Sequence, residues 1–142
     1  MSAREAEKKV VLITGASAGI GRETALILLA AGHVVYATAR DPKKVADLAR
    51  AGARTLALDV ENEVSIRKAV ATIAKKEGRI DILVNNAGYG SYGAVEDVPL
   101  EEARRQFEVN LFGLARVTQL VLPLMRARKS GRIVNIASIA GR

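Results

Sequence analysis

Residues 9–21 read KVVLITGASAGIG, and this stretch decides the fold. The apolar run VVLI predicts a strand that is buried on both faces. Gly15, Gly19 and Gly21 follow at once, and a helical spacing of apolar residues begins after them. A strand, a glycine-rich turn and a helix N-terminus in this order expose unpaired backbone N–H groups at the positive end of a helix dipole. The stretch therefore predicts a site for phosphate or pyrophosphate.

The glycine spacing is G-x-x-x-G-x-G, which differs from the commoner dinucleotide-binding pattern G-x-G-x-x-G. Three glycines alone are a weak signal, but their place between a strand and a helix is specific. The alternative is an ordinary tight turn between the two elements. That alternative leaves the need for three glycines unexplained.

The composition indicates one globular domain. The chain has 142 residues, of which 49% are apolar, so we interpret residues 1–142 as a single dinucleotide-binding domain. It contains no run of about 18 apolar residues that could cross a membrane. Its charged first residues do not resemble a signal peptide, and the absence of cysteine excludes disulfides and thiolate metal sites. These features favour a cytoplasmic protein without a membrane partner.

The net charge of +7 could indicate a nucleic-acid partner or another anionic ligand. However, the basic residues are mixed with acids, as in the segment EEARR at 101–105, and aromatic residues are few. We therefore interpret the charge as a solvated basic surface near a phosphate site and expect no nucleic-acid partner. The single histidine, His33, follows a glycine in a turn and is expected to be exposed. One histidine excludes a histidine cluster, and we expect no metal site.

Strand and helix patterns alternate along the whole chain, which predicts an α/β fold with a parallel sheet and helices on both faces. Short right-handed connections give a doubly wound, Rossmann-like sheet of about five strands in the order 3-2-1-4-5. The predicted strands are 10–13, 34–39, 54–58, 80–84 and 132–137. The first predicted helix begins after Gly21. The later ones cover 42–51, 63–77 and 101–128, and the last of these is expected to kink at Pro123.

Polar residues stand where the predicted strands end. Because the carboxyl ends of parallel strands meet at one edge of the sheet, we expect a ligand crevice there, next to the first and fourth strands. The residues at these ends are Thr14, Arg40, Asp59, Asn85 and Ser138.

Five motifs together resemble the short-chain dehydrogenase/reductase family. They are TGASAGIG at 14–21, DV at 59–60, NNAG at 85–88, VN at 109–110 and IVNIAS at 133–138. Their order and spacing match the family across the chain. The resemblance implies binding of NAD(P)(H) and hydride transfer at the carbonyl or alcohol group of a small substrate.

The resemblance also implies roles for single residues at the cofactor. Asp59 would meet the adenine, with Val60 beside it. The ribose would be lined by Asn86, Ala87 and Gly88. The pyrophosphate would be held by Gly15, Ser17, Gly19, Ile20 and Gly21.

Two further residues resemble catalytic positions of the family. Asn110 matches the helix asparagine whose backbone carbonyl anchors a proton-relay water. Ser138 matches the serine that hydrogen-bonds the substrate oxygen.

Each of these roles has a plainer alternative. Asp59 could simply begin a turn, without any contact with adenine. Asn86 could likewise be an ordinary turn residue. Ser138 could be an ordinary loop serine. Asn110 is different, because asparagine is unfavourable inside a helix and a local reason for it is expected.

The end of the second strand indicates the cofactor. Families that bind NAD usually place an acidic residue there, which accepts hydrogen bonds from the ribose. This chain has Ala39 and then Arg40, whose guanidinium suits a 2′-phosphate. Asp41 would be turned away into a helix cap by Pro42. We therefore expect NADP(H), with NAD less favoured.

The family's tyrosine–lysine pair would follow the serine by roughly a dozen residues, beyond Arg142. None of Tyr36, Tyr89 and Tyr92 is followed by lysine four residues later. We therefore expect the N-terminal, cofactor-binding part of a reductase, truncated before that pair, with little or no turnover alone. Two alternatives remain. One is an active enzyme completed by another chain or by Tyr89 or Tyr92 as proton donor, and the other is a minimal Rossmann scaffold without ligand.

The predicted fifth strand would form an edge of the sheet with apolar residues on it. Exposed edges and apolar helix faces promote association with another chain. We therefore expect a homo-oligomer, formed through the strand at 132–137 or through the 101–128 helix. The helix face in question carries Phe107, Leu111, Leu114, Thr118 and Leu122.

Overall fold

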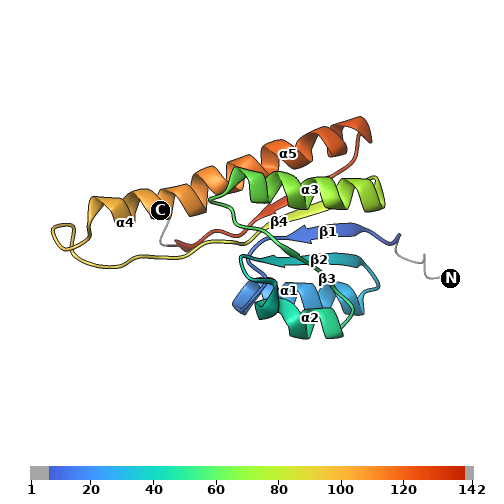
Figure 1. Ribbon diagram of the computed structural model, residues 1–142, viewed down its shortest axis with the longest axis horizontal. Helices are drawn as coiled ribbons and strands as arrows, with labels where there is room; N and C mark the ends of the chain where they lie inside the picture. Colours follow the sequence, from blue (N-terminus) through green and yellow to red (C-terminus); the bar gives the residue numbers. More distant parts are fainter. Residues whose placement is uncertain (1–6, 140–142) are drawn as a thin grey trace.

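The computed structural model describes residues 7–139, which form one parallel sheet between two layers of helices (Figure 1). The strands are β1 (Val10–Ile13), β2 (Val34–Ala39), β3 (Arg54–Ala57), β4 (Ile82–Asn85) and β5 (Arg132–Asn135). The helices are α1 (Gly19–Ala30), α2 (Ala46–Arg50), α3 (Glu63–Glu77), α4 (Leu100–Phe107) and α5 (Leu114–Ala127). A 3₁₀ turn (Pro42–Val45) precedes α2, and a π-helical segment (Glu108–Gly113) joins α4 to α5.

The strand order is β3-β2-β1-β4-β5, and every pairing is parallel. Both the fold class and the predicted order are confirmed. The central strand β1 pairs on both sides, so that Val11 lies between Val35 of β2 and Ile82 of β4. Helices α1 and α2 cover one face of the sheet, and α3 and α5 cover the other (Figure 1).

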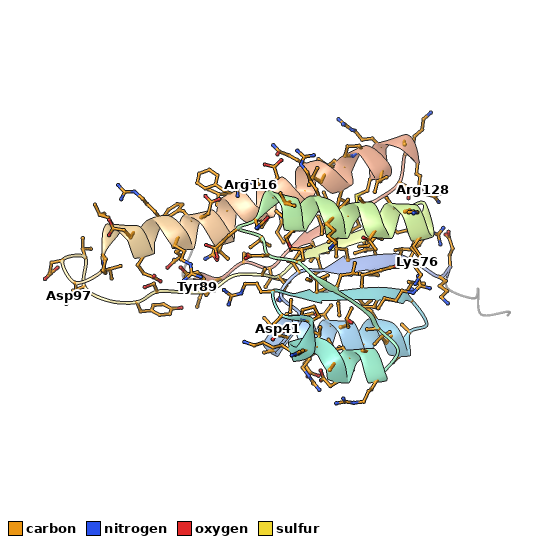
Figure 2. All side chains as sticks on the ribbon, viewed as in Figure 1. Asp41, Lys76, Tyr89, Asp97, Arg116 and Arg128 are labelled. Atoms are coloured by element: carbon orange, nitrogen blue, oxygen red, sulfur yellow. The ribbon has the colours of Figure 1, made fainter. Side chains whose placement is uncertain are left out.

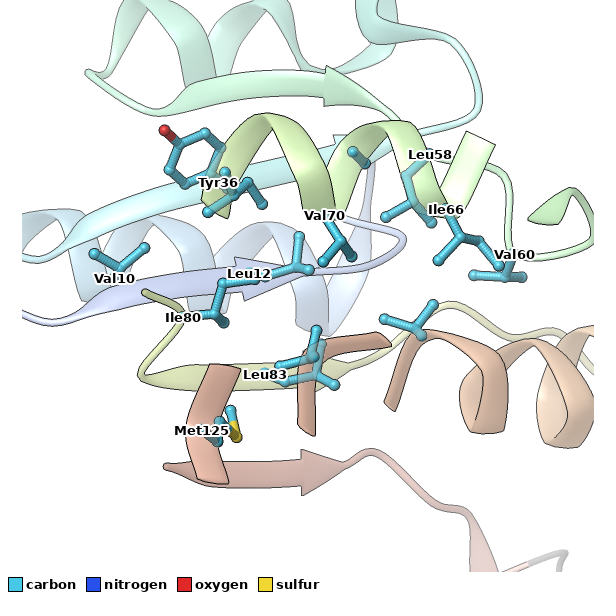
Figure 3. Packing of buried hydrophobic residues seen from close by; sticks show 14 of the residues in the cluster. Val10, Leu12, Tyr36, Leu58, Val60, Ile66, Val70, Ile80, Leu83 and Met125 are labelled. Carbon is cyan, nitrogen blue, oxygen red and sulfur yellow. The ribbon is translucent and has the colours of Figure 1, made fainter. Parts of the chain in front are cut away.

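Each face of the sheet has its own apolar core. On the α3 and α5 side, Leu12 and Leu83 point from the sheet toward Val70 of α3 and Met125 of α5 (Figure 3). On the α1 and α2 side, the core contains the alternate residues of the same strands, including Val11 and Ile13. Burial of both strand faces explains why β1 has an unbroken apolar sequence.

The long helix predicted at 101–128 is interrupted, but the expected position of the break is wrong. The regular hydrogen-bond pattern changes at Glu108–Gly113, where the turn widens to a π-helix, whereas Pro123 lies inside the uninterrupted α5. Gly113 packs so closely on the loop after β3 that a Cβ there would lie 2.7 Å from the Val60 carbonyl oxygen. The irregular turn thus coincides with close packing against the loop after β3, whereas the helix stays regular at the proline.

Smaller differences concern element ends. The fourth strand covers Ile82–Asn85 and not 80–84, and β3 and β5 end one and two residues earlier than predicted. The prediction that His33 is exposed is wrong: the side chain is half-buried beside the start of β1, and its Nδ1 accepts a hydrogen bond from the Lys9 amide at 3.3 Å. Asp41 caps the following 3₁₀ turn as expected, accepting from the Lys43 amide at 2.9 Å. No helix within residues 7–139 has the length and hydropathy needed to cross a membrane.

Candidate functional site

The turn between β1 and α1 needs glycine for two reasons. Gly15 and Gly19 have φ of +65° and +54°, in the left-handed region that favours glycine. A Cβ on Gly15 would lie 2.7 Å from the Ala87 Cα, and a Cβ on Gly21 would lie 2.7 Å from the Gly15 carbonyl oxygen. The segment after β4 can therefore pack directly against the turn only because side chains are missing there.

Thr14 and Asn86 fasten these two segments together. The Thr14 hydroxyl oxygen accepts from the amides of Asn86 and Ala87, each at 3.0 Å. In return, the Asn86 side-chain amide donates to the carbonyls of Gly15 at 2.8 Å and Thr14 at 3.2 Å. Asn86 thus shapes the turn from the neighbouring strand. Sequence reasoning placed Thr14 at the strand end but missed this bond, which joins residues 72 apart in the chain.

The start of α1 offers free backbone donors. Its N-cap residue is Ala18, which has no side-chain oxygen to accept from the first amides, and the first turn contains no acidic residue. By contrast, Asn62 caps α3 by accepting from the Ser65 amide. Nothing lies within 4 Å of the position that a Cβ on Gly19 would take. An uncapped helix start with open space in front of it suits an anion.

A pocket of about 360 Å³ opens beside this turn, where β2 ends. Ser17 of the turn lines it together with Ala39, Arg40, Asp41 and Lys44. Arg40 and Lys44 are exposed, and no ion pair within residues 7–139 engages either of them. The pocket therefore presents two cations and one carboxylate, that of Asp41, next to the uncapped helix start.

At the end of β3, Asp59 forms a turn as its plainer interpretation predicts. Its Oδ1 accepts from the Glu61 amide at 3.0 Å, and its own amide donates to the Ser65 hydroxyl at 3.0 Å. Val60 is buried in the core on the α3 and α5 side of the sheet. The structure thus explains both residues locally, and their contact with adenine stays a prediction.

Asn110 has a clear local reason to interrupt the helix. Its Oδ1 accepts from the Tyr89 amide at 3.0 Å, and its Nδ2 donates to the Tyr89 carbonyl at 2.7 Å. Gly88 lies against this bond, since a Cβ there would approach the Asn110 Oδ1 to 3.0 Å. The amide therefore holds the segment after β4 at the π-helical turn. π-Helical turns are frequent at functional sites.

Ser138 follows β5 and is exposed. The end of β5 is held by Asn85 of β4, whose carbonyl accepts from the Ile136 amide at 2.9 Å. The Asn85 side-chain amide donates to Asn135 at 2.9 Å and to Thr118 of α5 at 3.0 Å. These bonds fix the strand from which Ser138 emerges.

Tyr89 lies beside two charged side chains, those of Arg105 and Glu102. The guanidinium of Arg105 lies 5.9 Å from the centre of its ring, and Arg105 also pairs with Glu61 at 3.2 Å. Burial of the hydroxyl, and next the nearby Glu102 carboxylate, raise the pKa of Tyr89. A catalytic proton donor at neutral pH needs a lowered pKa. The surroundings of Tyr89 thus give no sign of the lowered pKa that this role would need, and the role of Tyr89 as a substitute proton donor stays a prediction.

The predicted site residues gather at the end of the sheet where its parallel strands finish. Figure 2 shows Asp41 and Tyr89 near this end, and Lys76 and Arg128 at the opposite end. Lys75, Lys76 and Arg126 stand in the last turns of α3 and α5, far from the glycine turn. The expectation that the basic excess lies near the phosphate site is therefore only partly correct.

Comparison with known proteins agrees with this geometry. The family model for short chain dehydrogenases matches residues 9–142. The chain belongs to the short-chain dehydrogenase family. A 3-ketodihydrosphingosine reductase from Bacteroides thetaiotaomicron is 43% identical over 135 residues, which are 95% of this chain and 49% of that protein. The chain thus spans about half the length of the curated relatives it matches.

Solved short-chain dehydrogenases have the same fold. A short-chain dehydrogenase from Streptomyces avermitilis superposes with a TM-score of 0.92 at 43% identity, covering 95% of this chain and 51% of the other. A metagenomic short-chain oxidoreductase in complex with NADP gives a TM-score of 0.85 at 34% identity, covering 94% and 63%. Members of the family bind nicotinamide dinucleotides, and the uncapped glycine turn and the cationic pocket fit such a ligand.

Proposed function

We propose that this chain binds NADP(H) and provides the cofactor-binding part of a reductase that acts on a small carbonyl or alcohol. The observation that carries the proposal is the pocket in which Ser17 of the glycine turn meets Arg40 and Lys44. A 2′-phosphate is a dianion near neutral pH, and a guanidinium can bind it with two parallel hydrogen bonds. The carboxylate of Asp41, the acidic residue of this pocket, accepts a hydrogen bond from the Lys43 amide.

The remaining cofactor contacts follow the same proposal. Backbone amides of Gly19, Ile20 and Gly21 would face the pyrophosphate, with Gly15 and Ser17 shaping the turn. Asp59 and Val60 would border the adenine, and Asn86, Ala87 and Gly88 would border the ribose. When bound, the cofactor supplies the hydride that passes to or from the substrate carbon.

The residues at the reacting end have supporting roles in this proposal. Ser138 would donate a hydrogen bond to the substrate oxygen, and the Asn110 carbonyl would hold a water for proton transfer. None of the tyrosines within the 142 residues is followed by lysine four residues later. We therefore expect cofactor binding by this chain and little turnover of a carbonyl substrate. A cysteine-free chain that uses NADPH also suits the cytoplasm.

Titration of the chain with NADPH and with NADH, followed by cofactor fluorescence, tests the proposal. We expect NADPH to bind more tightly, and Arg40→Ala to weaken NADPH binding by about tenfold to a hundredfold, since charge-assisted hydrogen bonds contribute about 1.5–3 kcal/mol. Binding of NADH, which lacks the 2′-phosphate, should change little. An equal loss for both cofactors would contradict the assignment of Arg40. Failure of both cofactors to bind would favour the scaffold without ligand.

A further inference from the structure

Lys44 occupies a place that its sequence neighbourhood does not reveal. It stands on the 3₁₀ turn Pro42–Val45, four residues after Arg40, and the two side chains line the same pocket. The turn is anchored by the buried Val45, which is 0% exposed. Its backbone is further fixed by Asp41, which accepts from the Lys43 amide. The position from which Lys44 reaches the pocket is therefore set by the fold.

The neighbouring Lys43 differs from Lys44 in one respect. Both lysines are exposed and both belong to the same 3₁₀ turn, but Lys43 does not line the pocket. Lys43 also has no ion pair within the described residues 7–139, so the two lysines form a matched pair. Any effect of Lys44 that Lys43 lacks must come from its place at the pocket.

Asp41 opposes the two cations of the pocket. With Arg40 and Lys44 positive and Asp41 negative, the charged lining carries a net charge of about +1 near neutral pH. Without Lys44, the charges of Arg40 and Asp41 would cancel. The charge that an additional phosphate would meet in this pocket thus includes those of Lys44 and Asp41 as well as that of Arg40.

We propose that Lys44 is a second specificity-determining cation that favours NADP(H), and that Asp41 limits this preference by its negative charge. The proposal rests on the proposed function, because it concerns the ligand of the same pocket. Lys44 would act as a point charge toward the 2′-phosphate, whereas Arg40 supplies the geometrically fixed donors. Asp41 would keep its capping role while it reduces the attraction for the phosphate.

The test uses two small probes and the whole chain. Calorimetry measures binding of 2′,5′-ADP, which has the 2′-phosphate, and of 5′-ADP, which lacks it. The variants are Lys44→Met, Lys43→Met, Lys44→Arg and Asp41→Asn. Asparagine is also a good N-cap residue, so Asp41→Asn removes charge while it retains the capping acceptor.

We expect Lys44→Met to weaken 2′,5′-ADP by about threefold to tenfold, the range for an exposed to partly buried charge contact. Binding of 5′-ADP should stay unchanged, and Lys43→Met should bind both probes as the parent chain does. Lys44→Arg should restore the preference, and Asp41→Asn should strengthen 2′,5′-ADP binding by about twofold to fivefold. The effects of Lys44→Met and Asp41→Asn should shrink with added salt, because exposed charges are screened.

Equal binding of 2′,5′-ADP to Lys44→Met and Lys43→Met would overturn the role of Lys44. If Arg40→Ala still weakened that probe in the same series, the proposed function would stand without it. If instead the parent chain bound 2′,5′-ADP no better than 5′-ADP, the proposed use of NADP(H) would fail together with this inference. A change in Asp41→Asn that is equal for both probes would overturn the role given to Asp41.

Discussion

Strands β1 and β5 both run parallel to their neighbours, but all four residues of β1 are apolar, whereas β5 has apolar residues only at Ile133 and Val134, and the two strands are buried to different extents. All residues of β1 are at most 2% exposed, whereas in β5 only Ile133 is half-buried and Val134 is 37% exposed. The difference arises from position, because β1 has a neighbouring strand on each side and helices on both faces, whereas among residues 7–139 β5 pairs with β4 alone. Apolar sequence thus indicates a strand, and the strand's place in the sheet decides how much burial stabilises it.

The two strands also carry different parts of the proposed site. The turn after β1 is held by Thr14 and Asn86 and backed by the core. The end of β5, from which Ser138 emerges, is held by β4 and by the Asn85 side chain. We therefore expect the turn after β1, which would bind the phosphates, to be rigid. The backbone around Ser138 should shift more readily when neighbouring residues are changed.

The largest difference should appear when one methyl-rich side chain is shortened in each strand. Leu12→Ala removes a fully buried side chain from the core, and its cost should be about 3 kcal/mol of unfolding free energy. Val134→Ala removes a partly exposed side chain at the edge and should cost less than about 1 kcal/mol. Urea unfolding followed by circular dichroism measures both values.

Similar losses of stability in Leu12→Ala and Val134→Ala would contradict the difference in burial between β1 and β5. That outcome would mean that β5 is covered in solution, for example by another copy of the chain. Repeating the unfolding at several protein concentrations separates the two cases, because only coverage by another copy makes the stability depend on concentration.

The sequence was sufficient where local chemistry dominates. The three glycines after an apolar strand predicted the turn, Asp41 and Pro42 predicted the cap, and the alternating pattern predicted the strand order. These features depend on residues close together in the chain, or on general rules of chain connection.

The sequence was insufficient where distant residues meet. The π-helical turn at Glu108–Gly113 depends on bonds between Asn110 and Tyr89 and on packing of Gly113 against Val60. The pocket that joins Ser17 to Lys44 depends likewise on how α1 and β2 lie side by side. Neither arrangement can be read from residues that are neighbours in the sequence. The break in the long helix was therefore predicted at Pro123, whereas it lies at Glu108–Gly113.

A second prediction concerns the turn after β1 and separates backbone strain from close packing. Gly15 and Gly78 have almost the same φ, +65° and +69°, but only Gly15 faces a neighbour. Gly78→Ala should cost about 1 kcal/mol for the left-handed backbone. Gly15→Ala should cost about 2 kcal/mol more, because the new Cβ meets the Ala87 backbone and adjustment is costly in a packed site.

The same pair has a second readout. Gly15→Ala should weaken NADPH binding, since the turn must move to relieve the contact, whereas Gly78→Ala should leave it unchanged. Thermal unfolding and cofactor titration of both variants measure the two effects. Equal destabilisation by the two substitutions would show that the segment after β4 can move away from the new Cβ without loss of stability. The hydrogen bonds of Thr14 and Asn86 that join this segment to the turn would then be weak.

The third comparison concerns surfaces on the β5 side. The predicted association surface on the helices carries Phe107 and Leu111, which are 60% and 50% exposed, and the strand surface carries Val134 and Ile136. Exposed apolar side chains on an open sheet edge favour pairing with another chain. We propose that the chain forms homo-oligomers through one of these two surfaces.

The smallest change in stability, below about 0.5 kcal/mol, is expected for Val134→Lys, because lysine at an exposed edge loses little packing. Its effect on association should be larger. If the strand edge pairs, sedimentation velocity should show the oligomer weakened in Val134→Lys but retained in Phe107→Ser, and the reverse if the helix surface pairs. Ile27→Lys, at a 68% exposed position of α1 on the opposite layer, is the charge-matched control and should associate as the parent chain does. If the parent chain remained monomeric at high concentration, the proposed oligomer would be contradicted. The difference in burial between β1 and β5 would then also hold for the chain in solution.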